Sequence, residues 1–278
     1  MSILLDRHSR VILQGGDDGS GPGCSAAWRA GGHAGRARIA AGVVYGTAEH
    51  LPDELLLFPS VREAKAWTNA TASVVCVAPE RAADAIVEAA EAGIGLVVCL
   101  TEHIPGADLQ RVRRRLCGGT TQLLLGCAGL VTPGEVHIGP IPGQALQRGR
   151  IGVLSGSAAL VSLAASQLAA FGLGESTVVA LGGEDAAAAA DGAGLGAVDL
   201  LRLFDADPGT DAVLLAGGLG EAAETACARW IDGHMRKPVV MLRHGTGPLP
   251  PGVRATRDPA ALGALVAEAV EPQWLPFD

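Results

Sequence analysis

The sequence predicts an α/β protein built from parallel sheets in two domains. Short runs rich in Val, Ile and Leu alternate with Ala-rich amphipathic stretches, which is the rhythm of βαβ units. Hydrophobic residues make up 49% of the 278 residues, aromatic residues only 3%, and there are 39 glycines. The core must therefore consist of Ala, Val, Leu and Ile, as in parallel strands packed closely under Ala-rich helices.

The first half contains five apolar runs of strand length separated by helical patterns. The expected strands are residues 10–13, 39–44, 73–77, 96–100 and 122–125, and the expected helices include 82–92 and 108–117. The segment GPIPGQALQRGR, residues 139–150, has the Pro and Gly content of a linker. We therefore expect two domains, residues 1–145 and 146–278.

The second half repeats the same alternation of strands and helices. Strands are expected to begin at Ile151, Thr177, Ala212 and Pro238. Helices are expected after Ser157 and over residues 197–204 and 221–233. This half therefore also predicts a parallel sheet covered by helices.

Charge and cysteine usage narrow the classes of function. The net charge of −8 argues against broad binding of nucleic acid or of an anionic membrane surface. The six cysteines form no CxxC pair and no His/Cys metal spacing, so we expect no metal site and mostly reduced core thiols. The first ten residues lack a signal-peptide layout, and no apolar run approaches the length of a membrane span. We expect a soluble cytoplasmic protein.

A glycine-rich turn follows the first expected strand in VILQGGDDGSGPG, residues 11–23. A strand that enters such a turn and then a helix can receive a phosphate group on backbone N–H groups and on the helix N-terminus. Asp17 and Asp18 oppose this reading because they place two negative charges beside an anion. The motif predicts phosphate or nucleotide binding, and the alternative is a plain tight turn.

Two further motifs follow expected strands of the first half. Thr101 and Glu102 stand at the carboxyl end of a strand, where open α/β sheets collect ligands, although a capped loop start explains them equally well. Cys127 lies between two glycines after another strand. Taken alone, it is better explained as a small buried residue than as a nucleophile.

Ser155-Gly156-Ser157 follows the first expected strand of the second half and precedes an Ala-rich helix. Hydroxyl groups and N–H donors at a helix N-terminus can hold an oxyanion or a phosphoryl group. The alternative is that either serine serves only as an N-cap. No neighbouring His and Asp support a serine nucleophile.

A series of segments extends along nearly the whole chain: MSILLDRHSRVILQG, FPSVREA, TASVVCV, EAGIGLVVCLTEHIP, GLVTPGEVHIG, IGVLSGSAAL, FGLGESTVVALGGED, DLLRLFDADPGTDAVLLAG and KPVV. Segments such as LVTPGE and FGLGEST have no general structural reason to occur together. Taken together and in this order, these segments resemble the alpha subunit of succinate–CoA ligase.

The resemblance implies a fold and a reaction. Family members have an N-terminal Rossmann-like CoA-binding domain and a C-terminal flavodoxin-like domain, and they pair with an ATP-grasp beta subunit. That subunit supplies the site for ATP or GTP and for Mg²⁺. A loop histidine of the alpha subunit is phosphorylated, its phosphoryl group passes to a small carboxylic acid, and CoA attacks the acyl phosphate. The implied cofactor of this chain is CoA.

The resemblance also assigns roles to particular residues. Ser155 and Ser157 match the serines that open the helix facing the phosphohistidine, and Cys127 matches a cysteine near the acyl site. His244 is nearest in topology to the phosphorylated histidine and is the candidate catalytic histidine. The residues matched to CoA binding are Gly16, Gly19, Ser20, Cys76, Val77, Ala78, Leu100, Thr101 and Glu102.

The chain departs from the family pattern around the reactive histidine. The long Gly-His-Ala-Gly loop is replaced by the short HGTGPLPPGV, residues 244–253, and Gly218 stands where the family has a glutamate. The family's CoA-loop lysine is lost in GVVYGTAEH, and Arg36 and Arg38 are hypothetical replacements. His33 and His103 are further candidate histidines, but no sequence neighbour supplies an orienting carboxylate. Each candidate is better explained as an ordinary surface or turn histidine.

Three functions follow from these observations. The leading hypothesis is an alpha-type subunit of an ADP- or GDP-forming acid–CoA ligase whose phosphohistidine step is altered or absent. The alternative is a non-catalytic CoA-binding, regulatory or structural subunit. An NAD-binding Rossmann protein fits the glycine loop alone, but the end of the second expected strand lacks the acidic residue that would bind the ribose.

Overall fold

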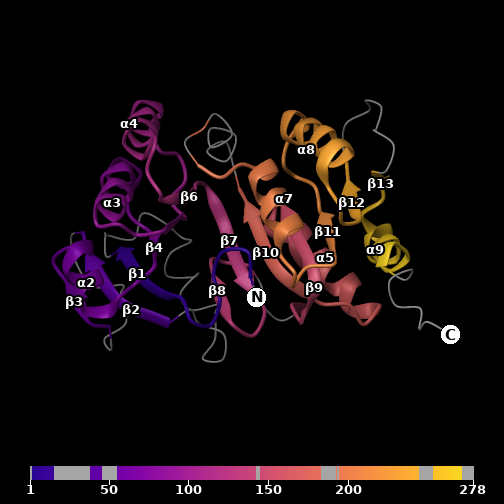
Figure 1. The fold of residues 1–278 in the computed structure, drawn as a ribbon, viewed down its shortest axis with the longest axis horizontal. Helices are drawn as coiled ribbons and strands as arrows, with labels where there is room; N and C mark the ends of the chain where they lie inside the picture. Colours follow the sequence, from indigo (N-terminus) through magenta and orange to yellow (C-terminus); the bar gives the residue numbers. More distant parts are fainter. Residues whose placement is uncertain are drawn as a thin grey trace.

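The computed structural model describes residues 2–15, 38–45, 55–141, 145–182, 192, 194–243 and 253–270. In these described residues, two sheets, of six and seven strands, lie next to each other (Figure 1). Helices cover both sheets. The predicted α/β class is confirmed.

The six strands of the first sheet are all parallel in the order β3-β2-β1-β4-β5-β6. This is the order of a Rossmann fold, whose strand order reverses between the first and fourth strands and leaves a crevice at their carboxyl ends. The strands are β1 (Arg10–Gly15), β2 (Arg38–Val44), β3 (Leu57–Phe58), β4 (Ala72–Val75), β5 (Leu96–Cys99) and β6 (Gln122–Leu124).

Three helices lie at the outer end of the molecule in Figure 1, on one face of this sheet: α2 (Val61–Thr68), α3 (Pro79–Glu91) and α4 (Gly106–Leu116). Small alanines let α3 approach the strands closely, and Ile86 is completely buried against them. Helix α2 and the short strand β3 were not among the expected elements. Ser60 caps α2 by accepting a hydrogen bond from the backbone N–H of Glu63 at 3.3 Å.

The second sheet contains five parallel strands in the order β10-β9-β11-β12-β13. Numbered along the chain, this order is 2-1-3-4-5, which is that of flavodoxin-like sheets. Its switch point lies between β9 and β11. The strands are β9 (Arg148–Ser155), β10 (Glu175–Leu181), β11 (Ala212–Leu215), β12 (Val239–Leu242) and β13 (Arg254–Thr256).

Two antiparallel strands, β7 (Cys127–Thr132) and β8 (Val136–Ile138), extend this sheet beyond β10. The second sheet is therefore mixed, whereas a parallel one was expected. Both strands precede the expected boundary after residue 145, so that boundary does not coincide with the division between the sheets. The division falls between β6 and β7, because backbone pairing with β10 assigns β7 to the second sheet.

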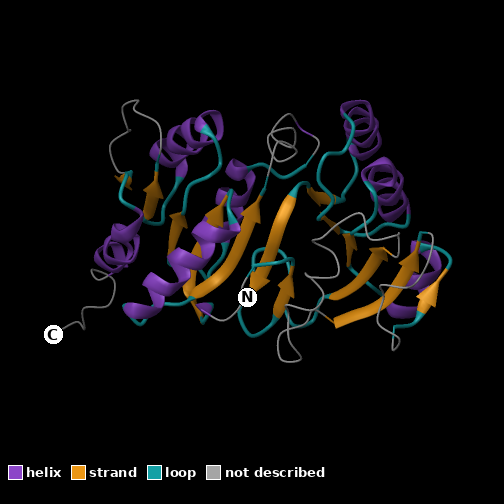
Figure 2. Ribbon diagram, turned by 180° about the vertical axis from the view of Figure 1, so that it is seen from behind, coloured by secondary structure: helices purple, strands orange, loops and turns teal. Residues whose placement is uncertain are grey.

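Helices α7 (Ala197–Ala206) and α8 (Glu221–His234) cover the near face of the second sheet in Figure 1. Helix α5 (Ala158–Ala170) crosses the opposite face in Figure 2, and α9 (Leu262–Val270) packs beside it. One cluster of buried apolar side chains contains Leu13 and Val74 of the first sheet together with Leu130 of the second sheet and Phe204 of α7, which covers that sheet. The two sheets therefore share part of their core.

Candidate functional site

The carboxyl end of β1 enters the expected phosphate loop. Gly16, Gly19 and Ser20, with Asp17 and Asp18, lie outside the described residues. The last described residue, Gly15, accepts a backbone hydrogen bond of 3.0 Å from Tyr45. The strand end that leads into the loop is therefore fixed to β2.

The ends of β4 and β5 form the best-described part of the expected CoA edge. The Thr101 hydroxyl donates a 2.8 Å hydrogen bond to the Val77 carbonyl oxygen and lies 3.3 Å from the Val77 amide nitrogen. Cys76 and Val77 are buried, Ala78 and Leu100 are half-buried, and Glu102 is exposed. The structure thus brings together the residues predicted from the two strand ends.

Helix α3 begins at Pro79, directly after Ala78, and its first N–H groups point toward this edge. Such a helix start favours an anionic group. His103 has a left-handed backbone with φ of 59° and its side chain is exposed, so it lies in the loop that leaves the edge.

A buried polar network lies at the carboxyl end of β1 and was not predicted from the sequence. The Gln14 side chain is completely buried; its amide donates to the Tyr45 hydroxyl and to the Ala85 carbonyl oxygen, both at 2.9 Å. Ser73 donates to the Gln14 carbonyl at 2.6 Å. Tyr45 donates to Glu88, and burial together with this bond raises the pKa of Tyr45. The network holds β1, β4 and α3 together just before the loop.

The Ser155–Ser157 turn lies at the switch point of the second sheet. Ser155 is fully buried; its hydroxyl accepts from the Ser157 amide at 3.1 Å and lies 3.0 Å from the Gly217 carbonyl oxygen. Ser157 is the N-cap of α5 and accepts from the Leu160 amide at 3.5 Å. The N-cap reading therefore holds for Ser157, and the Ser155 hydroxyl is used to join two loops.

Gly156 and Gly218 lie in backbone contact at this switch point. A Cβ atom on Gly156 would lie 1.9 Å from the Gly218 carbonyl oxygen. Gly218 adopts a left-handed φ of 78°, and Gly217 and Gly220 are left-handed as well. The position that the resemblance assigns to a glutamate therefore belongs to a tight glycine turn in front of α8 and carries no carboxylate.

Cys127 is buried at the start of β7 within the core shared by the two sheets. Burial raises the pKa of its thiol to about 12. The thiol is therefore protonated near neutral pH, and the structure favours the reading as a small buried residue. Cys99, Cys117 and Cys227 are also free, and Cys76 is disulfide-bonded. Most of the described cysteines are therefore reduced, as expected, although Cys117 is exposed and does not lie in the core.

His244 lies outside the described residues. The strand before it, β12, ends at Leu242, and the Arg243 amide donates a 3.0 Å hydrogen bond to Thr256 at the end of β13. Residues 243–253 thus connect two strands that are direct neighbours in the sheet.

Within the described part of the chain, no cluster of three or more His, Cys, Asp or Glu residues could hold a metal ion. In that same part, no helix combines the length and apolarity that crossing a membrane requires.

The Rossmann strand order and the edge built by β4 and β5 are typical of α/β proteins that bind nucleotides or coenzymes. In agreement, the CoA binding domain family matches residues 6–103. The Staphylococcus aureus (strain Mu50) "Succinate--CoA ligase [ADP-forming] subunit alpha" is 36% identical over 260 residues, which cover 91% of this chain and 81% of the relative. The protein of the same name from Staphylococcus epidermidis strain RP62A has the same identity and coverage. The chain belongs to the family of succinate–CoA ligase alpha subunits.

Solved structures share the fold at low sequence identity. Methanosaeta concilii ATP citrate lyase in complex with (3S)-citryl-CoA has a TM-score of 0.76 and 16% identity. The acetyl-coenzyme A synthetase of Ca. Korarchaeum cryptofilum, in complex with phosphate and ADP, has a TM-score of 0.64 and 19% identity. The matches cover 99% and 95% of this chain but only 52% and 56% of those chains, so it spans about half their length.

Proposed function

We propose that the chain is the CoA-binding alpha-type subunit of an acid–CoA ligase that works with an ATP-grasp beta-type subunit. The observation that carries the proposal is the CoA binding domain match over residues 6–103, which ends at the edge joined by Val77 and Thr101. The alpha-subunit relatives support a partner subunit, and ATP or GTP with Mg²⁺ would be bound there. The substrate is a small carboxylic acid.

Gly16, Gly19 and Ser20 are proposed to contact the CoA phosphates, and the start of α3 adds N–H donors nearby. Cys76, Val77 and Ala78 would pack on one side of CoA, with Leu100, Thr101 and Glu102 on the other. The acyl transfer would take place near the Ser155–Ser157 turn, where α5 presents its N-terminus to developing negative charge. Cys127 would lie behind this site as a packing residue.

We further propose that the phosphohistidine step is altered or absent. Gly218 provides no carboxylate to orient a histidine, and its turn is closed by the contact with Gly156. Residues 243–253 replace the long family loop with a short connection between neighbouring strands. In the altered reaction, the acid attacks the γ-phosphate of ATP on the partner, giving acyl phosphate and ADP. The CoA thiol then displaces phosphate and forms acyl-CoA.

The test is reconstitution with the cognate beta-type subunit, using ATP labelled in the γ-phosphate. We expect labelled inorganic phosphate and acyl-CoA without acid-labile label on the alpha chain. Stable phosphate on His244 would refute the altered step. Calorimetry with CoA tests the proposed cofactor, and adenosine, which lacks the phosphates and the pantetheine arm, is the control ligand. If CoA at millimolar concentration gives no heat of binding, CoA is excluded as the cofactor.

The loss of the glutamate at Gly218 also favours a second candidate, a non-catalytic CoA-binding or regulatory subunit. It predicts the same CoA titration but no acyl-CoA from the reconstituted complex with any small carboxylic acid. An NAD titration that gives heat where CoA gives none would instead favour the dinucleotide-binding reading.

A further inference from the structure

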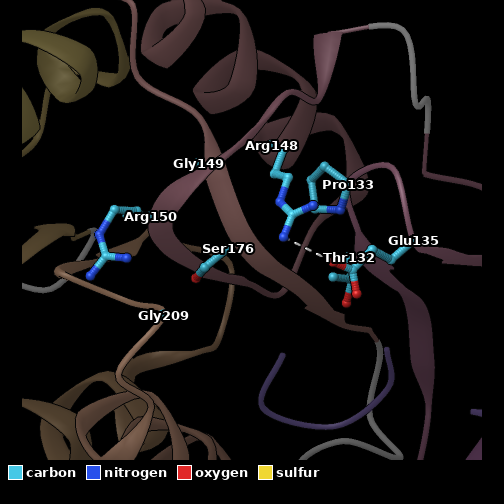
Figure 3. Close-up of a pocket in the computed structure, with 8 residues that line it drawn as sticks. All are labelled: Thr132, Pro133, Glu135, Arg148, Gly149, Arg150, Ser176 and Gly209. Atoms are coloured by element: carbon cyan, nitrogen blue, oxygen red, sulfur yellow. Dashed lines mark ion pairs between the residues drawn. The ribbon is translucent and has the colours of Figure 1, made fainter. Parts of the chain in front are cut away.

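A pocket of about 350 Å³ opens at the amino ends of the parallel strands of the second sheet. It is lined by Thr132, Pro133, Glu135, Arg148, Gly149, Arg150, Ser176 and Gly209 (Figure 3). Arg148 and Ser155 stand at opposite ends of β9, which at ~3.3 Å per residue separates them by more than about 20 Å. The pocket is therefore distinct from the proposed acyl-transfer edge.

The two arginines of the pocket have different roles. Arg150 is held by Asp211 through two nitrogens, one of them at 2.6 Å, and by the Pro208 carbonyl oxygen at 3.0 Å. Among the described residues, Arg148 makes one ion pair, 3.3 Å to Glu135, and its side chain is 66% exposed. A guanidinium carries five N–H donors. Arg148 therefore keeps donors for an anionic ligand, whereas Arg150 forms a fixed wall.

Glu135 is a rigid anchor for Arg148. Its side chain is only 9% exposed, and its second oxygen accepts a 3.2 Å hydrogen bond from the Arg7 amide. Both carboxylate oxygens are thus in use. Glu135 therefore holds one side of the Arg148 guanidinium beside the pocket, and the ion pair does not use all five of its N–H donors.

Ser176 presents a hydrogen-bond acceptor to the same pocket. Its hydroxyl lies 2.6 Å from that of Thr210, and Thr210 donates its single hydroxyl proton to Asp207 at 2.7 Å. Ser176 must therefore donate to Thr210, and no other described residue donates to the Ser176 oxygen, so its lone pairs can accept a hydrogen bond. Ser176 is also the extra residue where the pairing of β10 with β9 shifts register, and such bulges re-aim side chains.

These groups specify the chemistry of a ligand. We propose that the pocket is an effector site for a small hydroxycarboxylate, with the carboxylate on Arg148 and the hydroxyl donating to Ser176. The volume lies at the lower end of the ~300–1,000 Å³ range of small-molecule sites, and none of the described lining residues is aromatic. A coenzyme or an apolar ligand therefore does not match it. The ligand would join the starts of β9 and β10 to the β7–β8 turn.

Calorimetry on the full chain tests this assignment with L-malate, with succinate, which lacks the hydroxyl, and with inorganic phosphate. We expect malate to bind at least about tenfold more tightly than succinate, because a buried acceptor left unpaired penalises the analogue. Arg148→Ala should weaken malate binding by about tenfold or more. Ser176→Ala should lower the affinity for malate to that for succinate.

Arg202→Ala is the matched control. Arg202 is 60% exposed, pairs with Asp199 at 3.0 Å on α7 and is not among the residues that line the pocket, so this variant should bind malate like the wild type. Because the Arg148 side chain is exposed, Arg148→Ala should fold normally. Ser176 is buried, so thermal unfolding is used to check that Ser176→Ala is folded.

No heat from malate at about 10 mM, equal binding of malate and succinate, a preference for phosphate, or an unchanged Arg148→Ala would each overturn the proposal. A parallel titration with CoA distinguishes the effector-site proposal from the proposed CoA-binding function. If the protein binds malate but not CoA, only the proposed function is contradicted.

Discussion

The Thr101 hydroxyl donates a 2.8 Å hydrogen bond to the Val77 carbonyl oxygen, and this bond joins the ends of β4 and β5. Thr101 is 7% exposed, so the bond is shielded from water. The two segments that the sequence marks as a CoA edge therefore behave as one structural unit, and the proposed binding surface depends on that bond.

Thr101→Val removes the hydroxyl at nearly constant volume and leaves the Val77 carbonyl without this partner. We expect the free energy of unfolding to fall by about 1–3 kcal/mol and CoA to bind several-fold more weakly. Urea unfolding and calorimetry measure the two effects. Thr121→Val is the control, because Thr121 makes the same 2.8 Å bond to Ile94 at the opposite edge of the sheet. Equal loss of CoA affinity in both variants would contradict the prediction.

Gly156→Ala tests the closed turn at the second switch point. The added Cβ would meet the Gly218 carbonyl oxygen at 1.9 Å, so backbone must move, and we expect a loss of about 3 kcal/mol. Gly233→Ala is the control, because Gly233 lies in α8 with open space around it. That variant should gain about 0.5–1 kcal/mol. The urea midpoints of Gly156→Ala and Gly233→Ala are compared. Similar midpoints would show that the loop of Gly156 does not contact the loop of Gly218.

Much of the first sheet could be predicted from the sequence, because its short apolar runs alternate with helical patterns. The resemblance also marked residues 76–78 and 100–102 as two strand ends, but the hydrogen bond that joins Thr101 to Val77 is visible only in the structure. Helix α2 was missed although Ser60 and Glu63 have the spacing of a capping box, a signal that was available. The pairing of β7 with β10 was not predictable, because their residues are far apart in sequence and the hydrophobic pattern does not name the partner strand.

The same limit applies to the candidate sites. The serine turn could be recognised from its place before an Ala-rich helix, but its contact with Gly218 depends on loops that only the folded chain brings together. Arg148 and Arg150 stood in a segment interpreted as a linker, because Pro and Gly dominate its composition. The structure starts β9 at Arg148 and makes these arginines part of a pocket.

Cysteine labelling tests the burial of Cys127. Burial raises the pKa of Cys127 and of Cys227 to about 12, whereas Cys117 is exposed. Iodoacetamide reacts with thiolates, so at pH 8 the native protein should be alkylated at Cys117 and spared at the two buried thiols. Peptide mass spectrometry identifies the alkylated cysteines. Labelling in urea is the control that each thiol reacts once the chain is unfolded. Rapid native labelling of Cys127, suppressed by CoA or a carboxylic acid, would instead place it in an open site.

Glu175 is a buried carboxyl group at the start of β10, on the strand end that leads into Ser176. Its side chain accepts a 2.9 Å hydrogen bond from the Gln147 amide, while its other oxygen lacks a partner within the described structure. Burial raises the pKa of Glu175 from 4.5 to about 7. The folded protein therefore holds this proton at pH values where the unfolded chain has released it.

The sign of the resulting pH dependence follows from this difference. The contribution of Glu175 to stability is fully present below pH 4.5 and is lost as the pH rises to about 7. At about 1.4 kcal/mol per pKa unit, the rise of about 2.5 units corresponds to a total change of at most about 3.5 kcal/mol. Glu175→Gln does not titrate, so the stability difference between wild type and variant should shift against the wild type between pH 5 and 8. Burial lowers the pKa of His137, so its contribution to stability changes with pH in the opposite direction. This contribution is the same in wild type and variant and cancels in their difference. Urea unfolding across this range, with Glu268→Gln as the exposed control, measures the difference, and parallel curves for wild type and Glu175→Gln would contradict the raised pKa.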